Sequence, residues 1–177
     1  LRKRLESLSV ARVNRRNSRK GEFQAALVGY TNAGKSSLLK ALSKKDVLVE
    51  DRLFSTLDSK IRLADLGDGF EAMITDTVGF IRKLPHHLVA SFRSTLEGIG
   101  EANLLMHVID ASQIDWKNQK IVVDEVLGTL DLGAIPQVLV FNKIDKLSRQ
   151  EFLDLKYEIR NNQQKSAVFV SALNDKS

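Results

Sequence analysis

The sequence contains no cysteine, and no apolar run approaches the length of a membrane span. Without cysteine there can be no disulfide framework, no thiolate zinc site and no cysteine nucleophile. A transmembrane helix needs about 20 predominantly apolar residues, and the first residues also lack the apolar core of a signal peptide. These absences fit a reducing compartment, and we expect a soluble, cytoplasmic protein without a membrane span.

The 177 residues, 43% of them hydrophobic, suit one domain with a sizeable core rather than two. The net charge of +5 is unevenly distributed, because residues 1–20 carry eight Lys or Arg against one acidic residue, Glu6. Such a basic segment is typical of a solvated helical linker, and it is also suited to contact a nucleic-acid backbone. Composition leaves both interpretations open.

After Gly21, short apolar runs alternate with stretches of helical spacing. Strands are predicted at 25–29, 59–65, 70–76, 104–110, 138–143 and 167–172, and helices at 35–43, 88–101, 115–130 and 148–161. A Gly-rich turn at 66–69 predicts a hairpin between the second and third strands. This order predicts an α/β fold of the P-loop NTPase type, a doubly wound, mostly parallel sheet with one antiparallel strand. Residues 44–57 and 77–85 fit no element and are expected to be mobile loops.

The stretch GYTNAGKS, residues 29–36, matches the phosphate-binding pattern G-x-x-x-x-G-K-[ST] and lies between a predicted strand and a predicted helix. Glycines at the two ends allow successive backbone N–H groups to point at phosphate oxygens. Lys35 is expected to reach the β- and γ-phosphates, and the Ser36 hydroxyl to ligate Mg²⁺. The residues expected to contact the nucleotide here are Gly29, Tyr30, Thr31, Asn32, Ala33, Gly34, Lys35, Ser36 and Ser37.

A second motif, D-x-x-G, follows the predicted strand at 70–76 and comprises Asp76 to Gly79. A carboxylate at the end of a buried strand is costly without a cation or donors, and Mg²⁺ beside the phosphates would supply the cation. Gly79 can bring its N–H against a γ-phosphate without hindrance from a side chain. Alone the pattern describes many turns, but it follows the phosphate loop by about one hairpin.

The third motif, NKID at 142–145, predicts the base. Asp145 can accept hydrogen bonds from both the ring N–H and the exocyclic amine of guanine, a pair of donors that adenine lacks. Asn142 can brace the neighbouring loops, and the stem of Lys143 can cover the base. After the last predicted strand, Ser171, Ala172 and Leu173 are placed to offer a backbone N–H to the guanine carbonyl. Guanine nucleotides, GTP and GDP, are therefore the predicted ligands, and a P-loop ATPase or small-molecule kinase is disfavoured.

With these motifs the sequence resembles the HflX family of translation-factor-related GTPases. The resemblance is carried by residues 76–112, DTVGFIRKLPHHLVASFRSTLEGIGEANLLMHVIDAS, together with GYTNAGKS and DRLFSTLD at 51–58. It implies a cytoplasmic GTPase that uses Mg²⁺, binds the large ribosomal subunit and its rRNA, and splits or rescues stalled ribosomes. It also implies that Thr56 ligates Mg²⁺ and senses the γ-phosphate. The expected metal ligands are then Ser36, Thr56 and Asp76, and the expected catalytic residues are Lys35, Thr56 and Gly79.

The resemblance further implies that residues 1–20 are a basic helical linker from an N-terminal domain missing from this chain. Residues 21–177 would then be a G domain truncated after the last guanine motif, and we expect it to act as a monomer. Within this domain Phe80 stands where small GTPases have the glutamine that orients the attacking water, so intrinsic hydrolysis is expected to be slow. Asn32 resembles the asparagine of GTPases that bind K⁺ near the phosphates, and it also suits a tight turn.

Three functions remain open at this stage. The first is a GTPase that acts on the ribosome. The second is a GTPase switch in tRNA modification or ribosome assembly, which GYTNAGKS alone allows but the stretch at 76–112 disfavours. The third is a nucleotide-gated binding module with negligible turnover, which Phe80 makes plausible. Outside these motifs, His107 is expected to be a hydrogen-bonded histidine of the core.

Overall fold

The computed structural model describes residues 23–43, 60–65, 67–68, 70–77, 79–80, 99–161 and 166–173. Its strands are β1 (Phe23–Gly29), β2 (Lys60–Asp65), β3 (Glu71–Asp76), β4 (Leu104–Asp110), β5 (Gln137–Asn142) and β6 (Ala167–Phe169). Its helices are α2 (Lys35–Leu42), α4 (Trp116–Thr129) and α5 (Arg149–Asn161), with 3-10 turns η1 (Ile99–Glu101) and η2 (Ile144–Lys146). The predicted strand at 104–110 is confirmed to the residue.

The strands form one sheet in the order β2-β3-β1-β4-β5-β6. β1 is parallel to both β3 and β4, β4 to β5 and β5 to β6, whereas β2 and β3 pair antiparallel. The predicted doubly wound sheet with one antiparallel strand is therefore confirmed. Because β1 lies between β3 and β4, its carboxyl end meets theirs at one edge of the sheet, where ligands of open α/β sheets bind.

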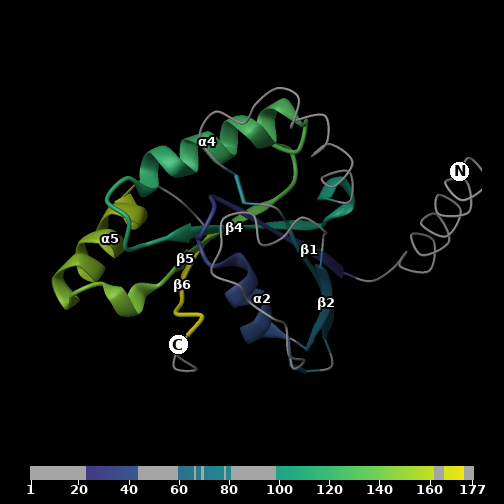
Figure 1. Cartoon of the computed structure of the whole chain (residues 1–177), viewed down its shortest axis with the longest axis horizontal. Helices are drawn as coiled ribbons and strands as arrows, with labels where there is room; N and C mark the ends of the chain where they lie inside the picture. Colours follow the sequence, from purple (N-terminus) through teal and green to yellow (C-terminus); the bar gives the residue numbers. More distant parts are fainter. Residues whose placement is uncertain are drawn as a thin grey trace, which may run out of the picture.

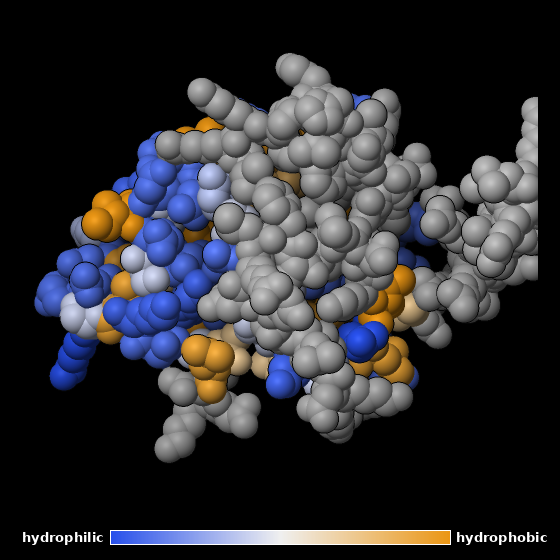
Figure 2. All heavy atoms as spheres, in the orientation of Figure 1, coloured by the Kyte–Doolittle hydropathy of each residue, from blue (hydrophilic) through white to orange (hydrophobic). Residues whose placement is uncertain are grey.

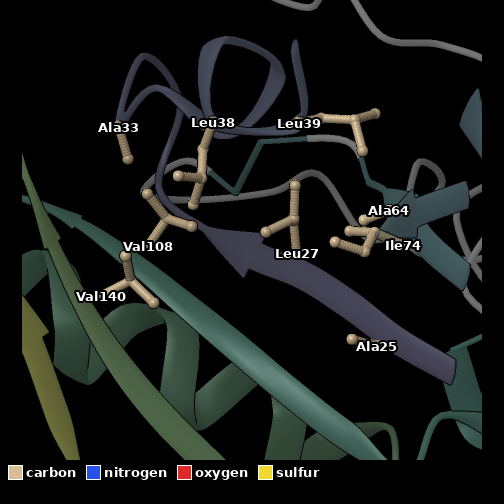
Figure 3. Close-up of a cluster of buried hydrophobic side chains, with 9 residues drawn as sticks. All are labelled: Ala25, Leu27, Ala33, Leu38, Leu39, Ala64, Ile74, Val108 and Val140. Atoms are coloured by element: carbon tan, nitrogen blue, oxygen red, sulfur yellow. The ribbon is translucent and has the colours of Figure 1, made fainter. Parts of the chain in front are cut away.

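Alternate residues of each strand face opposite layers of helices. Ala25 and Leu27 of β1 face α2, where they pack with Leu38 and Leu39 (Figure 3). Their neighbours Ala26 and Val28 face the other side, where α4 contributes Val123 and Leu127. On that side α5 contributes Leu155 and Ile159, which pack against Ile109 and Phe141. The sheet is thus sandwiched between α2 on one face and α4 with α5 on the other (Figure 1).

Two predicted strands end earlier than expected. The strand predicted at 167–172 stops at Phe169, because the following backbone turns toward the loop after β5, where the Ile144 N–H donates to the Val170 carbonyl at 3.3 Å. The strand predicted at 138–143 ends at Asn142, since Lys143 adopts a left-handed φ of 64° that leaves the ladder. Of the helix predicted at 88–101, the structure describes η1 alone, and the loop predicted at 44–57 lies outside the described residues.

His107 is buried in β4, as predicted, but the expected hydrogen bond is not formed by its Nδ1 atom. That atom lies 3.6 Å from Asp124 Oδ1 of α4, which is too long for a hydrogen bond. Burial lowers the pKa of His107, and the neighbouring Asp124 only partly opposes this effect. The histidine is therefore neutral at pH 7 and packs as part of the core.

On the face shown in Figure 2, the described residues over α4 and α5 are mainly hydrophilic, and hydrophobic side chains occur in small separate groups. In the described part of the chain, every helix is too short or too polar to span a bilayer.

Candidate nucleotide-binding site

The loop between β1 and α2 depends on backbone conformations that ordinary residues avoid. Gly34 has φ 95°, and a Cβ added to it would lie 2.2 Å from Asn142 Nδ2. Asn32 also has a positive φ, 58°, which asparagine tolerates better than most residues. Gly29 is restricted by its neighbour, since its Cβ would lie 2.3 Å from the Val108 carbonyl oxygen. The loop therefore closes into a tight backbone cradle in front of the N-terminus of α2, where the helix dipole favours an anion.

Lys35 begins α2 and is buried beneath this cradle, with 6% of its surface exposed. Its Nζ donates to the carbonyl oxygens of Gly29, at 3.1 Å, and Tyr30, at 3.0 Å. Burial lowers the pKa of Lys35 to about 8, and the nearby Asp76 carboxylate only partly opposes this shift. A phosphate beside Nζ would favour the charged form, so an anionic ligand is expected to raise this pKa again.

Ser36 and Asp76 meet at the carboxyl end of β3. The Ser36 hydroxyl donates to Asp76 Oδ2 at 2.6 Å, and Asp76 is fully buried. The next residue, Thr77, donates from its hydroxyl to the Leu27 carbonyl of β1 at 2.6 Å, which fixes the point where the chain leaves β3. A hydroxyl and a single carboxylate suit Mg²⁺, which usually takes one or two carboxylates and completes its shell with phosphates and water. Thr56, the third expected ligand, lies outside the described residues.

The D-x-x-G segment lies directly against the phosphate loop. The Phe80 N–H donates to the Gly29 carbonyl at 3.1 Å, and the Thr31 N–H donates to the Phe80 carbonyl at 2.8 Å. A Cβ on Gly79 would lie 2.7 Å from Thr31 Cα and 3.1 Å from Lys35 Nζ. A glycine is therefore required there for the two segments to approach, whereas the contact predicted between the Gly79 N–H and a γ-phosphate stays a prediction.

The side chain of Phe80 points away from this contact and into the core. It is 3% exposed and packs with Val28 of β1 and with Ile99 of η1. The ring has no hydrogen-bonding group, and it is also buried in the core, so it cannot position a water molecule at the phosphates. Its burial has a structural reason that the sequence pattern did not reveal.

The NKID motif braces the phosphate loop from the neighbouring strand. Asn142 Nδ2 donates to the Ala33 carbonyl at 3.0 Å, and Asn142 Oδ1 accepts from the Ala172 N–H at 3.0 Å. Lys143 Nζ donates to the Asn32 carbonyl at 2.7 Å. The bracing predicted for Asn142 is present, and Lys143 adds a second tie to the loop.

Asp145 lies on η2 and is exposed. Its Oδ1 accepts from the Ser171 hydroxyl at 2.5 Å, so the loop after β6 holds the carboxylate predicted to read the base. Of the stretch predicted to offer a backbone N–H to the guanine carbonyl, Ala172 donates its N–H to Asn142 in this structure, and the Leu173 side chain is largely exposed. Ser37 lies in the first turn of α2. The three motifs thus converge on one edge of the sheet, although their contacts with a nucleotide remain predictions.

Sequence reasoning missed Asp110, the last residue of β4, whose Oδ2 accepts from Lys143 Nζ at 2.7 Å. It also missed Thr77, whose role depends on the position of β1. The available signal was the polar residue that ends an apolar strand at the carboxyl edge of the sheet. The D-x-x-G and NKID motifs marked Asp76 and Asn142 as candidates, whereas Asp110 ends its strand outside any of the three motifs.

The chain is similar to known proteins over most of its length. The family described as 50S ribosome-binding GTPase matches residues 24–143. The GTPase HflX of Alkalihalophilus pseudofirmus is 49% identical over 146 residues, which are 81% of this chain and 34% of that protein. The chain thus spans about a third of the length of the curated relative that it matches.

Two solved structures share the fold. A GTP-binding protein from the archaeon Sulfolobus solfataricus, in complex with GDP, is 26% identical with a TM-score of 0.66, covering 95% of this chain and 55% of that one. Era, solved with MgGDPNP and nucleotides 1506–1542 of 16S ribosomal RNA, is 25% identical with a TM-score of 0.68 and covers 85% and 51%. The motifs, the sheet order and these similarities agree: the chain belongs to the 50S ribosome-binding GTPase family and, within it, is a G domain of the HflX family.

Proposed function

We propose that this domain binds GTP and GDP with Mg²⁺ and hydrolyses GTP to GDP and phosphate. The observation that carries the proposal is the convergence of a buried lysine, a hydroxyl paired with a carboxylate, and the NKID motif around one backbone cradle. The family match supports the proposal, because the family that matches residues 24–143 is described as 50S ribosome-binding GTPase.

Each residue has a distinct role in this proposal. Lys35 stabilises the charge of the β- and γ-phosphates, and Gly79 brings its N–H toward the γ-phosphate. Ser36 and Asp76 would hold Mg²⁺ together with Thr56, and the bound ion would neutralise charge that develops on the phosphate oxygens. Asp145 reads the base, while Ser171, Ala172 and Leu173 border it. Because the Phe80 ring is buried in the core, the residue that positions water must come from elsewhere, and a partner is the natural source.

We also propose that the full-length protein is a cytoplasmic monomer that binds the large ribosomal subunit through rRNA. In this scheme GTP orders the loops at Thr56 and Gly79, the protein engages the ribosome to split or rescue it, and hydrolysis releases it. The family description and the HflX similarity support this partner. Residues 1–20, proposed to be a basic linker from an N-terminal domain, carry positive charge suited to rRNA phosphates.

Large ribosomal subunits are expected to stimulate single-turnover GTP hydrolysis by the full-length protein at least about tenfold, by lowering the barrier by roughly 1.4 kcal/mol or more. The measurement compares rates with and without subunits, and cosedimentation should be stronger with a GTP analogue than with GDP. Small subunits serve as the control. Binding to large subunits without faster GTP hydrolysis would favour the nucleotide-gated binding module. Binding to small subunits or tRNA, and not to large subunits, would favour a role in ribosome assembly or tRNA modification.

The proposed K⁺ site at Asn32 has a separate test. The left-handed backbone of Asn32 by itself explains an asparagine without any ion, so the cation must be tested directly. If K⁺ supplies part of the charge neutralisation, hydrolysis should be several-fold faster in KCl than in NaCl at equal ionic strength, and Asn32→Ala should remove the difference. Equal rates in the two salts would rule out the site.

A further inference from the structure

Lys143 is held between two acceptors that come from different parts of the chain. Its Nζ lies 2.7 Å from the Asn32 carbonyl of the phosphate loop and 2.7 Å from Asp110 Oδ2 at the end of β4. The side chain of Asp110 is 6% exposed and that of Lys143 is 23% exposed, so the ion pair is largely shielded from water. Shielded, charge-assisted hydrogen bonds are stronger and better defined in geometry than surface ion pairs.

The carboxylate of Asp110 is itself fixed in orientation. Its Oδ1 accepts from the Ser112 N–H at 3.0 Å and from the Ser112 hydroxyl at 2.6 Å, which leaves Oδ2 for Lys143. Burial alone would raise the pKa of Asp110, but the hydrogen bonds from Lys143 and Ser112 outweigh it and lower the pKa below its ordinary value. Asp110 is therefore an anion at neutral pH, with each oxygen assigned to a different partner.

The sheet places this pair at the junction of the two halves of the candidate site. Asp110 is in register with Asn142 of β5, and the Ala111 N–H donates to the Asn142 carbonyl at 2.9 Å. Asn142 donates in turn to the Ala33 carbonyl, next to the Asn32 carbonyl that Lys143 contacts. Two consecutive carbonyls of the phosphate loop thus accept hydrogen bonds from two consecutive residues of NKID, and Lys143 contacts Asp110 at the same time.

We propose that Asp110, oriented by Ser112, is a positioning residue that directs Lys143 onto the phosphate loop and so joins the guanine and phosphate parts of the site into one unit. This inference rests on the proposed nucleotide site. Asp110 acts through Lys143, and its substitution should weaken the binding of GDP and GTP to a similar extent. It should not change the chemical step, because Lys35, Ser36 and Asp76 do not contact it in the described structure.

The test measures the dissociation rate of a fluorescent GDP analogue from the full-length protein carrying Asp110→Asn. The amide oxygen can still accept from Ser112, but the amide nitrogen then faces Lys143 Nζ, and neither group can accept from the other. We expect dissociation about tenfold faster, an effect of roughly 1.4 kcal/mol. The KM for GTP should rise while kcat at saturating GTP stays within about twofold of the wild type.

A double-mutant cycle separates positioning from a general structural effect. If Asp110 acts through Lys143, then D110N combined with Lys143→Met should release GDP no faster than Lys143→Met alone. The inference would be overturned if the double variant released GDP at a rate that combines the increases of both single variants. It would also be overturned if D110N released GDP at the wild-type rate. Glu158→Gln is the matched control, because it removes the charge from an ion pair with Lys117 between α4 and α5, away from the nucleotide motifs.

Thermal unfolding without nucleotide would show whether D110N folds. If it does not fold, a second variant can still test the inference. Ser112→Ala removes one of the two hydrogen-bond donors to the Asp110 Oδ1 atom and keeps the ion pair with Lys143. We expect GDP dissociation to be about twofold to threefold faster. This increase should be absent when Lys143→Met is also present. Its persistence there would also overturn the inference. A wild-type protein that fails to bind the GDP analogue would instead refute the proposed nucleotide site, so the two failures are distinct.

Discussion

Asp145→Asn is expected to weaken GDP binding about a hundredfold and to give the protein a preference for XDP. The carboxylate of Asp145 is proposed to accept from two N–H groups of guanine, and charge-assisted hydrogen bonds contribute about 1.5 to 3 kcal/mol each. The asparagine amide presents a donor to one of these N–H groups, whereas xanthine offers a carbonyl that accepts from it. A loss of about 3 kcal/mol corresponds to roughly a hundredfold in Kd.

The measurement is a parallel titration of GDP and XDP against the wild type and the variant. Asp154→Asn on α5 is the control, since it makes the same chemical change at an exposed aspartate whose partner is Gln150 of the same helix. The Ser171 hydroxyl, which holds Asp145, would keep an acceptor in the asparagine side chain oxygen. Unchanged GDP affinity in Asp145→Asn would contradict the assignment of guanine recognition to NKID.

Lys35→Met is expected to reduce GTP affinity by about a hundredfold or more while leaving the empty domain as stable as the wild type, within about 1 kcal/mol. The reason for the second part is structural. Burial disfavours the charge of Lys35 before any phosphate is present, and methionine has similar length without a charge. The two carbonyls that Lys35 contacts also keep other donors, from the Phe80 N–H to Gly29 and from the Ala33 N–H to Tyr30.

Nucleotide titration and thermal unfolding of the empty protein test both parts, with Lys40→Met, an exposed lysine of the same helix, as the control. Full GTP affinity in Lys35→Met would refute the phosphate role, and a large loss of stability would refute the account of burial.

The same lysine gives a pH dependence with a defined sign. Its pKa of about 8 in the empty site lies below the ordinary 10.5, and phosphate binding should raise it again. GDP binding at pH 8 should therefore take up about half a proton, which calorimetry in buffers of different ionisation enthalpy detects and Lys35→Met abolishes. For folding, the unfolded chain binds more protons at this site between pH 8 and 10.5, so the contribution of Lys35 to the free energy of unfolding rises with pH across that window.

The local sequence pattern was sufficient to predict structure where the backbone conformation depends on neighbouring residues in the chain. The glycines of GYTNAGKS mark positive φ and close approach, which is a backbone property readable from residue type. An apolar run closed by a polar residue located β4 to the residue, because a buried parallel strand ends where the chain returns to the edge of the sheet. The same rule predicted a strand that continues beyond the observed end of β6. A local pattern contains no information about the turn that brings the residues after Phe169 to NKID.

Contacts that depend on strand order were beyond the reach of pattern. Asp110 and Lys143 are 33 residues apart, and they meet because β4 and β5 are parallel neighbours whose ends are in register. Thr77 reaches the Leu27 carbonyl because β3 lies beside β1. The burial of Phe80 likewise depends on the layer beneath α4, and its residue type alone suggested only the absence of a hydrogen-bonding group.

The sequence by itself determined the fold class and the order of the three nucleotide motifs, because those follow from periodicity and from the conformational demands of single residues. Only the tertiary structure decided how the motifs act on one another. It placed Lys35 under the phosphate loop with a lowered pKa, set Phe80 into the core, and brought Asp110 within hydrogen-bond distance of Lys143. These are properties of strand register and of exclusion from water, which arise when distant segments pack and are encoded in no single stretch of the chain.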